Sequence, residues 1–295
     1  MKKILALLLT ALFVVVLAAC GSNEGEETQT GSDSTEENGG EATEETQENT
    51  EIVVGASSTP HAVILEEAKP LLAEKGITLK IEQYQDYIFP NKDLANGTLD
   101  ANYFQHVPYL NDQEEEFGYD FVNLGGIHIE PMGVYSKNIK SVDEIPDGTT
   151  VIISRSIPDH GRILALFEEQ GLIKLKEGVD KVSAKIDDIV ENPKNLNFDP
   201  SVEAALLPEM YDKEEDALVA INTNYAIEAD LNPTEDSLFI EGAKSPYVNV
   251  VAARSEDKDN EALKTLVEVL QSEEIQNFIK EEFQGNIVPA PTEGE

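Results

Sequence analysis

Short runs of β-branched and aliphatic residues recur along residues 51–295, and glycine, proline or polar residues bound each run. Such runs, for example 52–57 and 149–154, predict strands. Between the runs, apolar residues follow at intervals of three and four positions, as they do from Pro60 to Gly76, which predicts helices. Because strands and helices alternate, the pattern predicts an α/β protein whose mostly parallel sheets are covered by helices on both faces.

The same pattern predicts two lobes. The other strands are expected at 78–84, 100–104, 121–136, 216–221, 237–242 and 249–254, and the other helices at 91–97, 107–117, 159–171, 201–210, 222–231 and 257–283. The β-rich runs 121–136 and 247–254 are expected to cross between the lobes. Lobe 1 would then comprise 51–133 and 249–295, and lobe 2 would comprise 134–248.

The first residues have the pattern of an export signal. Residues 1–19 begin with two lysines, continue with an apolar stretch too short for a stable membrane span, and end in small residues. Cys20 follows and is the only cysteine, so it has no internal disulfide partner. The sequence LAAC resembles the lipobox of bacterial lipoproteins, which implies lipidation of Cys20. The alternative is a small residue that merely lies beside a cleavage site.

Residues 20–50 are expected to be this lipidated cysteine and a disordered tether. Residues 21–50 carry ten acidic residues, no basic residue and no large apolar residue. Such a segment buries too little apolar surface to offset the entropy of ordering it. As a coil, thirty residues span roughly 30 Å, and charge repulsion lengthens them further.

The negative charge of the chain makes some classes of binding partner unfavourable. Its formal net charge is −37 at pH 7, which argues against nucleic acid and anionic lipid as binding partners. After the signal peptide, no stretch is long and apolar enough to span a membrane, so the chain is not expected to be a permease. The sequence motifs G-x-S-x-G, G-x-x-x-x-G-K-[ST] and G-x-G-x-x-G are absent, so no catalytic role and no cofactor are expected.

Candidate ligand residues gather where the predicted strands end, the place where open α/β sheets bind ligands. They comprise Tyr87, Phe104, His106 and Tyr109 in lobe 1, together with Arg162 in the first turn of a helix, Asn222 and Asn249. A guanidinium can hold a carboxylate through two parallel hydrogen bonds, and amides suit an amino group. Aromatic rings suit an apolar or thioether side chain. The set therefore predicts a pocket for a free amino acid with an apolar tail.

Each residue also has a simpler interpretation. Aromatic residues at strand ends are often part of the core, an arginine at a helix start is often a surface charge, and an asparagine there is often a cap. A metal site is a further alternative, because His128 and Glu130 in the sequence HIE could supply two ligands. The other histidines, His61, His106 and His160, do not form a histidine-rich loop.

Long motifs resemble the methionine-binding lipoproteins of the NlpA family. They include ANYFQHVPYL, HIEPMGVYSK, DIVENPKNLNF, AINTNYAIEADLNPT and SPYVNVV, and the resemblance covers 51–290 in order. It implies a two-lobed periplasmic-binding-protein fold, type II-like, with the ligand cleft between the lobes. It also implies the substrate-binding lipoprotein of a methionine ABC importer, which is lipid-anchored on the extracytoplasmic face of the cell membrane. Such a protein would deliver its ligand to permease and ATPase subunits and use no catalytic cofactor or metal.

The resemblance also implies roles for the residues at the strand ends. The wall around the ligand side chain maps onto Tyr87, Phe104, His106 and Tyr109, the carboxylate-binding arginine onto Arg162, and two amides onto Asn222 and Asn249. One loop departs from the family: SRSIPDHGR at 154–162 stands where the family has a loop like NDPTNGGR. Arg155, Asp159 and His160 thereby replace small or amide residues.

Because loop 154–162 departs from the family, the sequence does not fix the identity of the ligand. L-methionine is the leading candidate, and D-methionine, a methionine-containing dipeptide and another apolar amino acid are alternatives. A metal-binding lipoprotein, an enzyme and a signalling module are the remaining alternatives.

Overall fold

The computed structural model describes residues 49–242 and 245–290. The expected signal peptide, Cys20 and the tether up to residue 48 lie outside the described residues.

A six-stranded sheet of order β13-β4-β12-β3-β1-β2 forms the centre of the first lobe. Its strands are β1 (Thr50–Ser57), β2 (Ile77–Tyr84), β3 (Ala101–His106), β4 (Phe121–Ile129), β12 (Val248–Arg254) and β13 (Val288–Pro289). Strand β1 pairs in parallel with β2 and β3, whereas β12 pairs antiparallel with β3 and β4. The last residue of β3, His106, lies beside Asn249 of β12 in this register.

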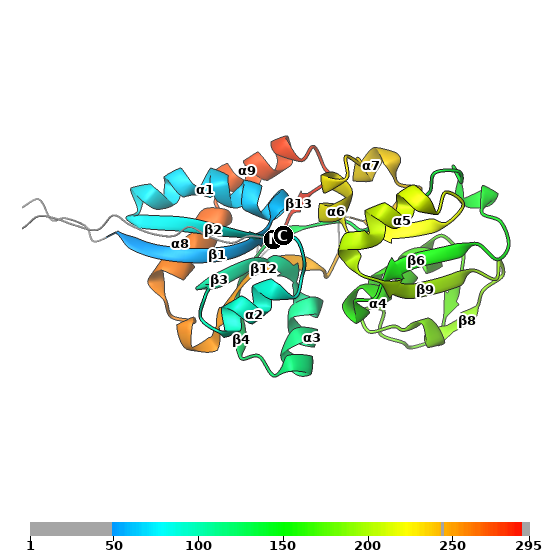
Figure 1. Cartoon of the computed structure of the whole chain (residues 1–295), viewed down its shortest axis with the longest axis horizontal. Coiled ribbons are helices and arrows are strands. Elements are labelled where there is room, and N and C mark those ends of the chain that lie inside the picture. Colours follow the sequence, from blue (N-terminus) through cyan, green and yellow to red (C-terminus); the bar gives the residue numbers. More distant parts are fainter. Residues whose placement is uncertain (1–48, 243–244, 291–295) are drawn as a thin grey trace, which may run out of the picture. The chain divides into compact units, whose positions relative to one another are not determined.

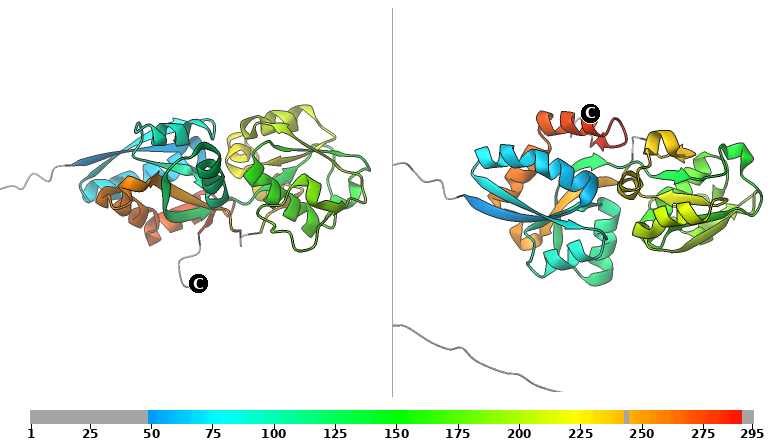
Figure 2. Two further views of the ribbon diagram at one scale, coloured as in Figure 1. Left: turned by 90° about the horizontal axis from the view of Figure 1, so that it is seen from below. Right: turned by 45° about the horizontal axis from the view of Figure 1, so that its top comes forward.

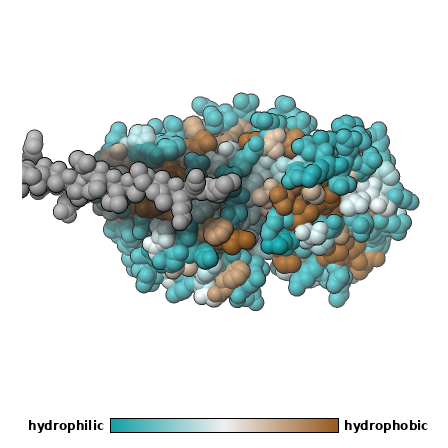
Figure 3. All heavy atoms as spheres, in the orientation of Figure 1, coloured by the Kyte–Doolittle hydropathy of each residue, from teal (hydrophilic) through white to brown (hydrophobic). Residues whose placement is uncertain are grey.

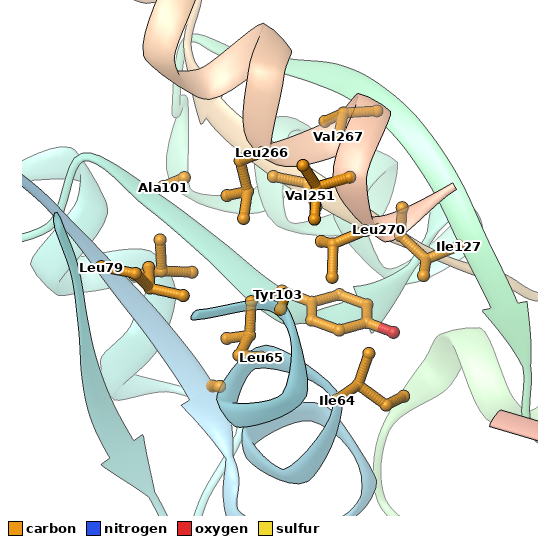
Figure 4. Close-up of a cluster of buried hydrophobic side chains, with 14 of the residues drawn as sticks. Ile64, Leu65, Leu79, Ala101, Tyr103, Ile127, Val251, Leu266, Val267 and Leu270 are labelled. Carbon is orange, nitrogen blue, oxygen red and sulfur yellow. The ribbon is translucent and has the colours of Figure 1, made fainter. Parts of the chain in front are cut away.

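Helices cover both faces of this sheet (Figure 1, Figure 2). One face carries α1 (Val63–Glu74), α8 (Glu261–Leu270) and α9 (Glu273–Glu282), and the other carries α2 (Phe89–Ala95) and α3 (Val107–Phe117). The larger core lies on the first face, where the fully buried Tyr103 packs among aliphatic side chains such as Leu65 and Leu266 (Figure 4). This packing fixes β3, whose end carries Phe104 and His106.

The second lobe is built on a five-stranded sheet of order β11-β5-β10-β6-β9. Its strands are β5 (Gly133–Tyr135), β6 (Thr150–Ser154), β9 (Asn197–Val202), β10 (Leu218–Ile221) and β11 (Phe239–Ile240). Helix α4 (Ile157–Glu169) packs in one core on this sheet, and α5 (Leu207–Lys213) and α6 (Thr223–Glu228) pack in another. A short ribbon of β7 (Lys174–Leu175) and β8 (Ile189–Glu191) lies beyond α4, and α7 (Pro233–Asp236) follows α6.

The chain passes from the first sheet to the second within the expected long strand 121–136. Strand β4 belongs to the first sheet and β5 to the second, and residues 130–132 join them. The return passage lies between β11 and β12. Strand β12 itself lies wholly in the first sheet, so the expectation that 247–254 is the crossing is wrong in detail.

Three other expectations differ from the structure. The sheets are mixed rather than mostly parallel, because β4, β12 and β13 pair antiparallel in one sheet and β5 pairs antiparallel with both of its neighbours in the other. The helix expected at 257–283 is two helices, because Ser272 caps the second at the backbone N–H of Ile275. Residues 201–202 end strand β9 instead of beginning a helix.

Polar residues dominate the face of the molecule shown in Figure 3, as the acidic composition leads one to expect. Among the described residues, no helix has both the length and the apolar character needed to cross a membrane.

Candidate functional site

A pocket lies where the two lobes meet. It is lined by Tyr87, Phe104, Gln105, His106, Tyr109, Glu130, Asp159, Arg162, Asn222, Thr223, Asn224 and Asn249. All seven residues expected from the sequence are among them. The structure therefore brings together the rings of β3, of α3 and of the loop after β2 with polar side chains from α4, from β12 and from the start of α6.

Three rings form an aromatic wall, which we define as Tyr87, Phe104 and Tyr109. The centroid of the Tyr87 ring lies 6.0 Å from those of both Phe104 and Tyr109, and the latter two are 6.1 Å apart. The Tyr109 hydroxyl donates to the backbone oxygen of Tyr87 at 2.9 Å, which fixes the loop after β2 against α3. These tilted and edge-on arrangements are the favoured geometries of aromatic pairs.

His106 joins the aromatic wall to the second lobe. Its Nδ1 accepts a hydrogen bond from the backbone N–H of Tyr109 at 3.1 Å and so caps helix α3. A neutral imidazole that accepts at Nδ1 carries its proton on Nε2. His106 therefore donates from Nε2 to Oδ1 of Asp159, 3.3 Å away on α4.

Arg162 is buried and held from several sides. Its Nη2 donates to Glu241 at 2.5 Å and to the backbone oxygen of Glu130 at 2.8 Å, and its guanidinium lies 4.4 Å from the ring centroid of Tyr247. Burial opposes the charged form, but Glu241 and Asp159 outweigh it and raise the pKa of Arg162. Helix α4 begins at Ile157, so Arg162 lies in its second turn and not, as expected, in its first.

Asp159 occupies that first turn instead and is 2% exposed. Its Oδ2 accepts from Asn222 Nδ2 at 3.1 Å, and its Oδ1 lies 3.9 Å from Nη1 of Arg162. Burial alone would raise the pKa of Asp159, but His106, Arg162 and Asn222 together hold it below the usual value. A helix N-terminus further favours a negative charge at this position.

The amides of the second lobe leave polar atoms unpaired. Asn222 precedes α6 but makes no side-chain cap, and its Oδ1 has no hydrogen-bond partner within the described residues. The same holds for Nδ2 of Asn224 and Nε of Arg162. The Oδ1 of Asn224 accepts from the Tyr87 hydroxyl at 2.6 Å, which is a second bond between the lobes.

Asn249 belongs to the first lobe, unlike Asn222 and Asn224. It lies on β12 in the sheet of the first lobe, and its Oδ1 is 3.0 Å from Nε2 of His61. It still lines the pocket.

His61, His128 and Glu130 form a buried cluster whose ligand atoms lie close enough together for a metal ion. Burial lowers the pKa of His61 to about 4 and that of His128 to about 3, so both are neutral at pH 7. Their Nε2 atoms lie 3.2 and 2.9 Å from Oε1 of Glu130, and Oε2 accepts from the backbone N–H of Asn224. The hydrogen bond of His61 Nε2 goes to Asn249, but His128 donates to Oε1 and the Asn224 N–H donates to Oε2, so each carboxylate oxygen has a donor, which favours a structural network over a metal centre.

Five residues of the pocket lie outside the expected set: Gln105, Glu130, Asp159, Thr223 and Asn224. Asp159 is one of the residues that depart from the family loop, and Glu130 belongs to the HIE motif. The sequence had therefore drawn attention to both residues, although neither was predicted to contact the ligand. Of the other two departures, Arg155 is exposed and pairs with Glu203, and His160 lies 2.9 Å from the backbone oxygen of Ser154. Neither lines the pocket.

Comparison with known proteins gives consistent matches. The model of the NlpA lipoprotein family matches residues 52–291. The methionine-binding lipoprotein MetQ of Bacillus subtilis (strain 168) is 43% identical over 291 residues, which cover 98% of this chain and 99% of that protein.

Two solved structures agree closely with this one. A nutrient binding protein from Burkholderia cenocepacia bound to methionine has a TM-score of 0.77 and 39% identity, covering 81% of this chain and 100% of that chain. A periplasmic substrate-binding protein of an ABC transporter from Coxiella burnetii has a TM-score of 0.76, with the same identity and coverage. The fold is thus the two-lobed fold of periplasmic substrate-binding proteins, with a cleft between the lobes. Because the family match extends over the whole of this fold, the chain belongs to the NlpA lipoprotein family.

Proposed function

We propose that this protein is the substrate-binding lipoprotein of an ABC importer, that it captures methionine, with L-methionine as the leading ligand, and that it is not an enzyme. The observation that carries the proposal is the pocket itself. One side is the aromatic wall, and the other holds the unpaired Nε of Arg162, Oδ1 of Asn222 and Nδ2 of Asn224. Buried polar atoms normally have partners, and a zwitterion supplies both acceptors and donors.

The two ends of methionine match the two sides of the pocket. The thioether side chain packs against Tyr87, Phe104 and Tyr109, because sulfur makes favourable contacts with ring edges. The carboxylate accepts from Arg162. Since Nη2 already serves Glu241 and the Glu130 backbone, the carboxylate meets Nε or Nη1 singly. Two parallel bonds, as the sequence suggested, would require one of those partners to leave.

His106 takes part in closing the cleft, and Asn222 and Asn249 complete the ligand site. The bonds His106–Asp159 and Tyr87–Asn224 both join the lobes, as expected of a closed state. We propose that lobe 1 (51–133 and 249–295) and lobe 2 (134–248) move as units, and that ligand favours closure through its higher affinity for the closed state.

Delivery requires a membrane partner. We propose that Cys20 is lipidated after removal of residues 1–19, and that the acidic tether holds the protein on the extracytoplasmic face of the cell membrane. The family and the name of the Coxiella burnetii protein support this placement. There the closed form would pass methionine to the permease and ATPase subunits of the importer.

The experiment is mass spectrometry of the small molecules that freshly purified protein releases on unfolding. We expect up to one methionine per chain, and chiral chromatography assigns it as L or D. If the protein releases no amino acid, and the refolded, emptied protein binds neither enantiomer, the proposal is wrong. Metal analysis of the same sample tests the cluster of His61, His128 and Glu130 independently.

A further inference from the structure

We propose that the Asp159 carboxylate binds the protonated amino group of the ligand, so that this pocket requires a free ammonium more strictly than it requires a free carboxylate. The inference rests on the proposed function and narrows its substrate class. The ligands are primary amines with a methionine-like side chain, and the class includes derivatives that lack the carboxylate.

The geometry of Asp159 leaves room for such a ligand. An ionised carboxylate can accept about four hydrogen bonds. Asp159 accepts two from side chains, from His106 at 3.3 Å and Asn222 at 3.1 Å, and Arg162 stays at 3.9 Å. The side chain is 2% exposed and lines the pocket. An ammonium in the pocket would supply the donors that the carboxylate still lacks.

Glu130, the other carboxylate of the pocket, lies beside two buried histidines. Its Oε1 lies within hydrogen-bond distance of Nε2 of both His61 and His128, and its Oε2 accepts from the Asn224 backbone. Both carboxylates accept two hydrogen bonds, and Asp159 is the more strongly ionised of the two, because its neighbours hold its pKa below the usual value whereas burial raises the pKa of Glu130.

The charge balance around Arg162 favours a cationic group in the same way. This single guanidinium faces Asp159 at 3.9 Å and Glu241 at 2.5 Å, and its Nη2 also donates to the backbone of Glu130. A purely anionic ligand would add negative charge to a buried cluster that already has more carboxylates than cations, whereas an ammonium reduces the excess.

The test uses three ligands: L-methionine, L-methioninamide, which lacks the carboxylate, and N-acetyl-L-methionine, which lacks the ammonium. Their affinities are measured by calorimetry at pH 6.5, where free amino groups are mostly protonated. The proteins are the wild type, Asp159→Asn and the matched control Glu241→Gln. Both substitutions neutralise a carboxylate beside Arg162, but only Asp159 lines the pocket.

We expect the wild type to bind methioninamide and to bind N-acetylmethionine at least tenfold more weakly. Asp159→Asn should weaken methionine and methioninamide at least tenfold each without weakening N-acetylmethionine. Glu241→Gln should leave the preference for methioninamide over N-acetylmethionine unchanged.

Equal methioninamide affinity in the wild type and Asp159→Asn overturns the inference, because an Asp159 that only orients Arg162 would affect carboxylate binding alone. In that case methionine binding by the wild type still leaves the proposed function standing. A wild type that binds no methionine overturns the proposed function, and the inference falls with it.

Discussion

Most of the site residues that the sequence predicted are single residues at or near the ends of strands. Phe104 and His106 end β3, and Asn222 follows β10, so the rule that ligands bind beyond strand ends identified them. The sequence did not predict that Asp159 and Glu130 line the pocket, and the reason is physical. A carboxylate becomes part of a pocket through its distance to partners from other elements, and sequence spacing does not give that distance.

Arg162→Ala tests the residue that binds the ligand carboxylate. We expect methionine binding to lose about 2–5 kcal/mol, because a desolvated carboxylate would lose its charged partner. Calorimetry measures the loss, and Arg155→Ala is the control, since that arginine is exposed and lies outside the pocket. Arg162→Lys keeps the charge beside Glu241 but loses the planar fork, so an intermediate affinity is expected. Unchanged affinity in both Arg162 variants would refute the assignment.

Phe104→Ala tests the aromatic wall. Phe104 is 4% exposed and lines the pocket, so its removal should weaken methionine far more than alanine, whose methyl group does not reach the rings. The comparison is the ratio of the two affinities by calorimetry. Phe117→Ala serves as control because Phe117 is 54% exposed on α3. Equal losses for methionine and alanine would count against the wall as a side-chain pocket.

At the scale of elements, the existence of helices was easier to predict than their ends. The apolar spacing in α4 was clear, but Pro158 in its first turn moves the start to Ile157, which turns Asp159 and Arg162 into residues of successive turns. The spacing in 257–283 continues through two helices because α8 and α9 bury their apolar faces in the same core. Periodicity therefore did not reveal the break at Ser272.

Gly161→Ala tests the close approach that positions α4. A Cβ at Gly161 would lie 2.4 Å from the backbone oxygens of Lys181 and Val182, so α4 or that loop must shift. We expect a loss of about 1–3 kcal/mol in the free energy of unfolding, as for other overpacked sites. Methionine binding should weaken as well, because Asp159 and Arg162 flank the glycine. Urea unfolding measures the loss.

Gly242→Ala is the matched control, because a Cβ there would meet nothing within 4 Å. Equal stability of Gly161→Ala and the wild type would show that the loop yields without cost.

At the scale of the whole molecule, the α/β class and the passage between lobes followed from the order of elements, whereas the mixed character of the sheets did not. Pairing direction depends on which strands become neighbours, and β12 inserts between β3 and β4 from the far end of the chain. The cluster of His61, His128 and Glu130 likewise depends on this assembly. It joins the helical turn Ser58–Ala62 after β1, strand β4 and the passage to the second lobe, where Asn224 completes it.

The pH dependence of stability tests this cluster. In the unfolded chain, histidine binds a proton near pH 6.5, but in the fold burial delays protonation of His61 to about pH 4 and of His128 to about pH 3. The unfolded state therefore binds more protons between these values. The stability that each neutral histidine contributes is present above pH 6.5 and is lost as the pH falls, by on the order of 1 kcal/mol per pH unit.

Burial raises the pKa of Glu130, so its contribution to stability increases as the pH falls, opposite to that of the histidines. We therefore compare the wild type with His128→Gln, in which only one histidine is changed. Glutamine keeps a donor for Glu130 but does not titrate. The difference in unfolding free energy between the two proteins should shrink from pH 7.5 to pH 5 in urea titrations. A difference that stays constant over this range would show that His128 is not buried in its neutral form.

The most direct measurement is a crystal structure of the protein grown with L-methionine. We predict one methionine between the lobes, with its thioether against Tyr87, Phe104 and Tyr109, its carboxylate on Arg162 and its amino group on Asp159. Methionine bound elsewhere, or placed with its carboxylate against the rings, would contradict the account.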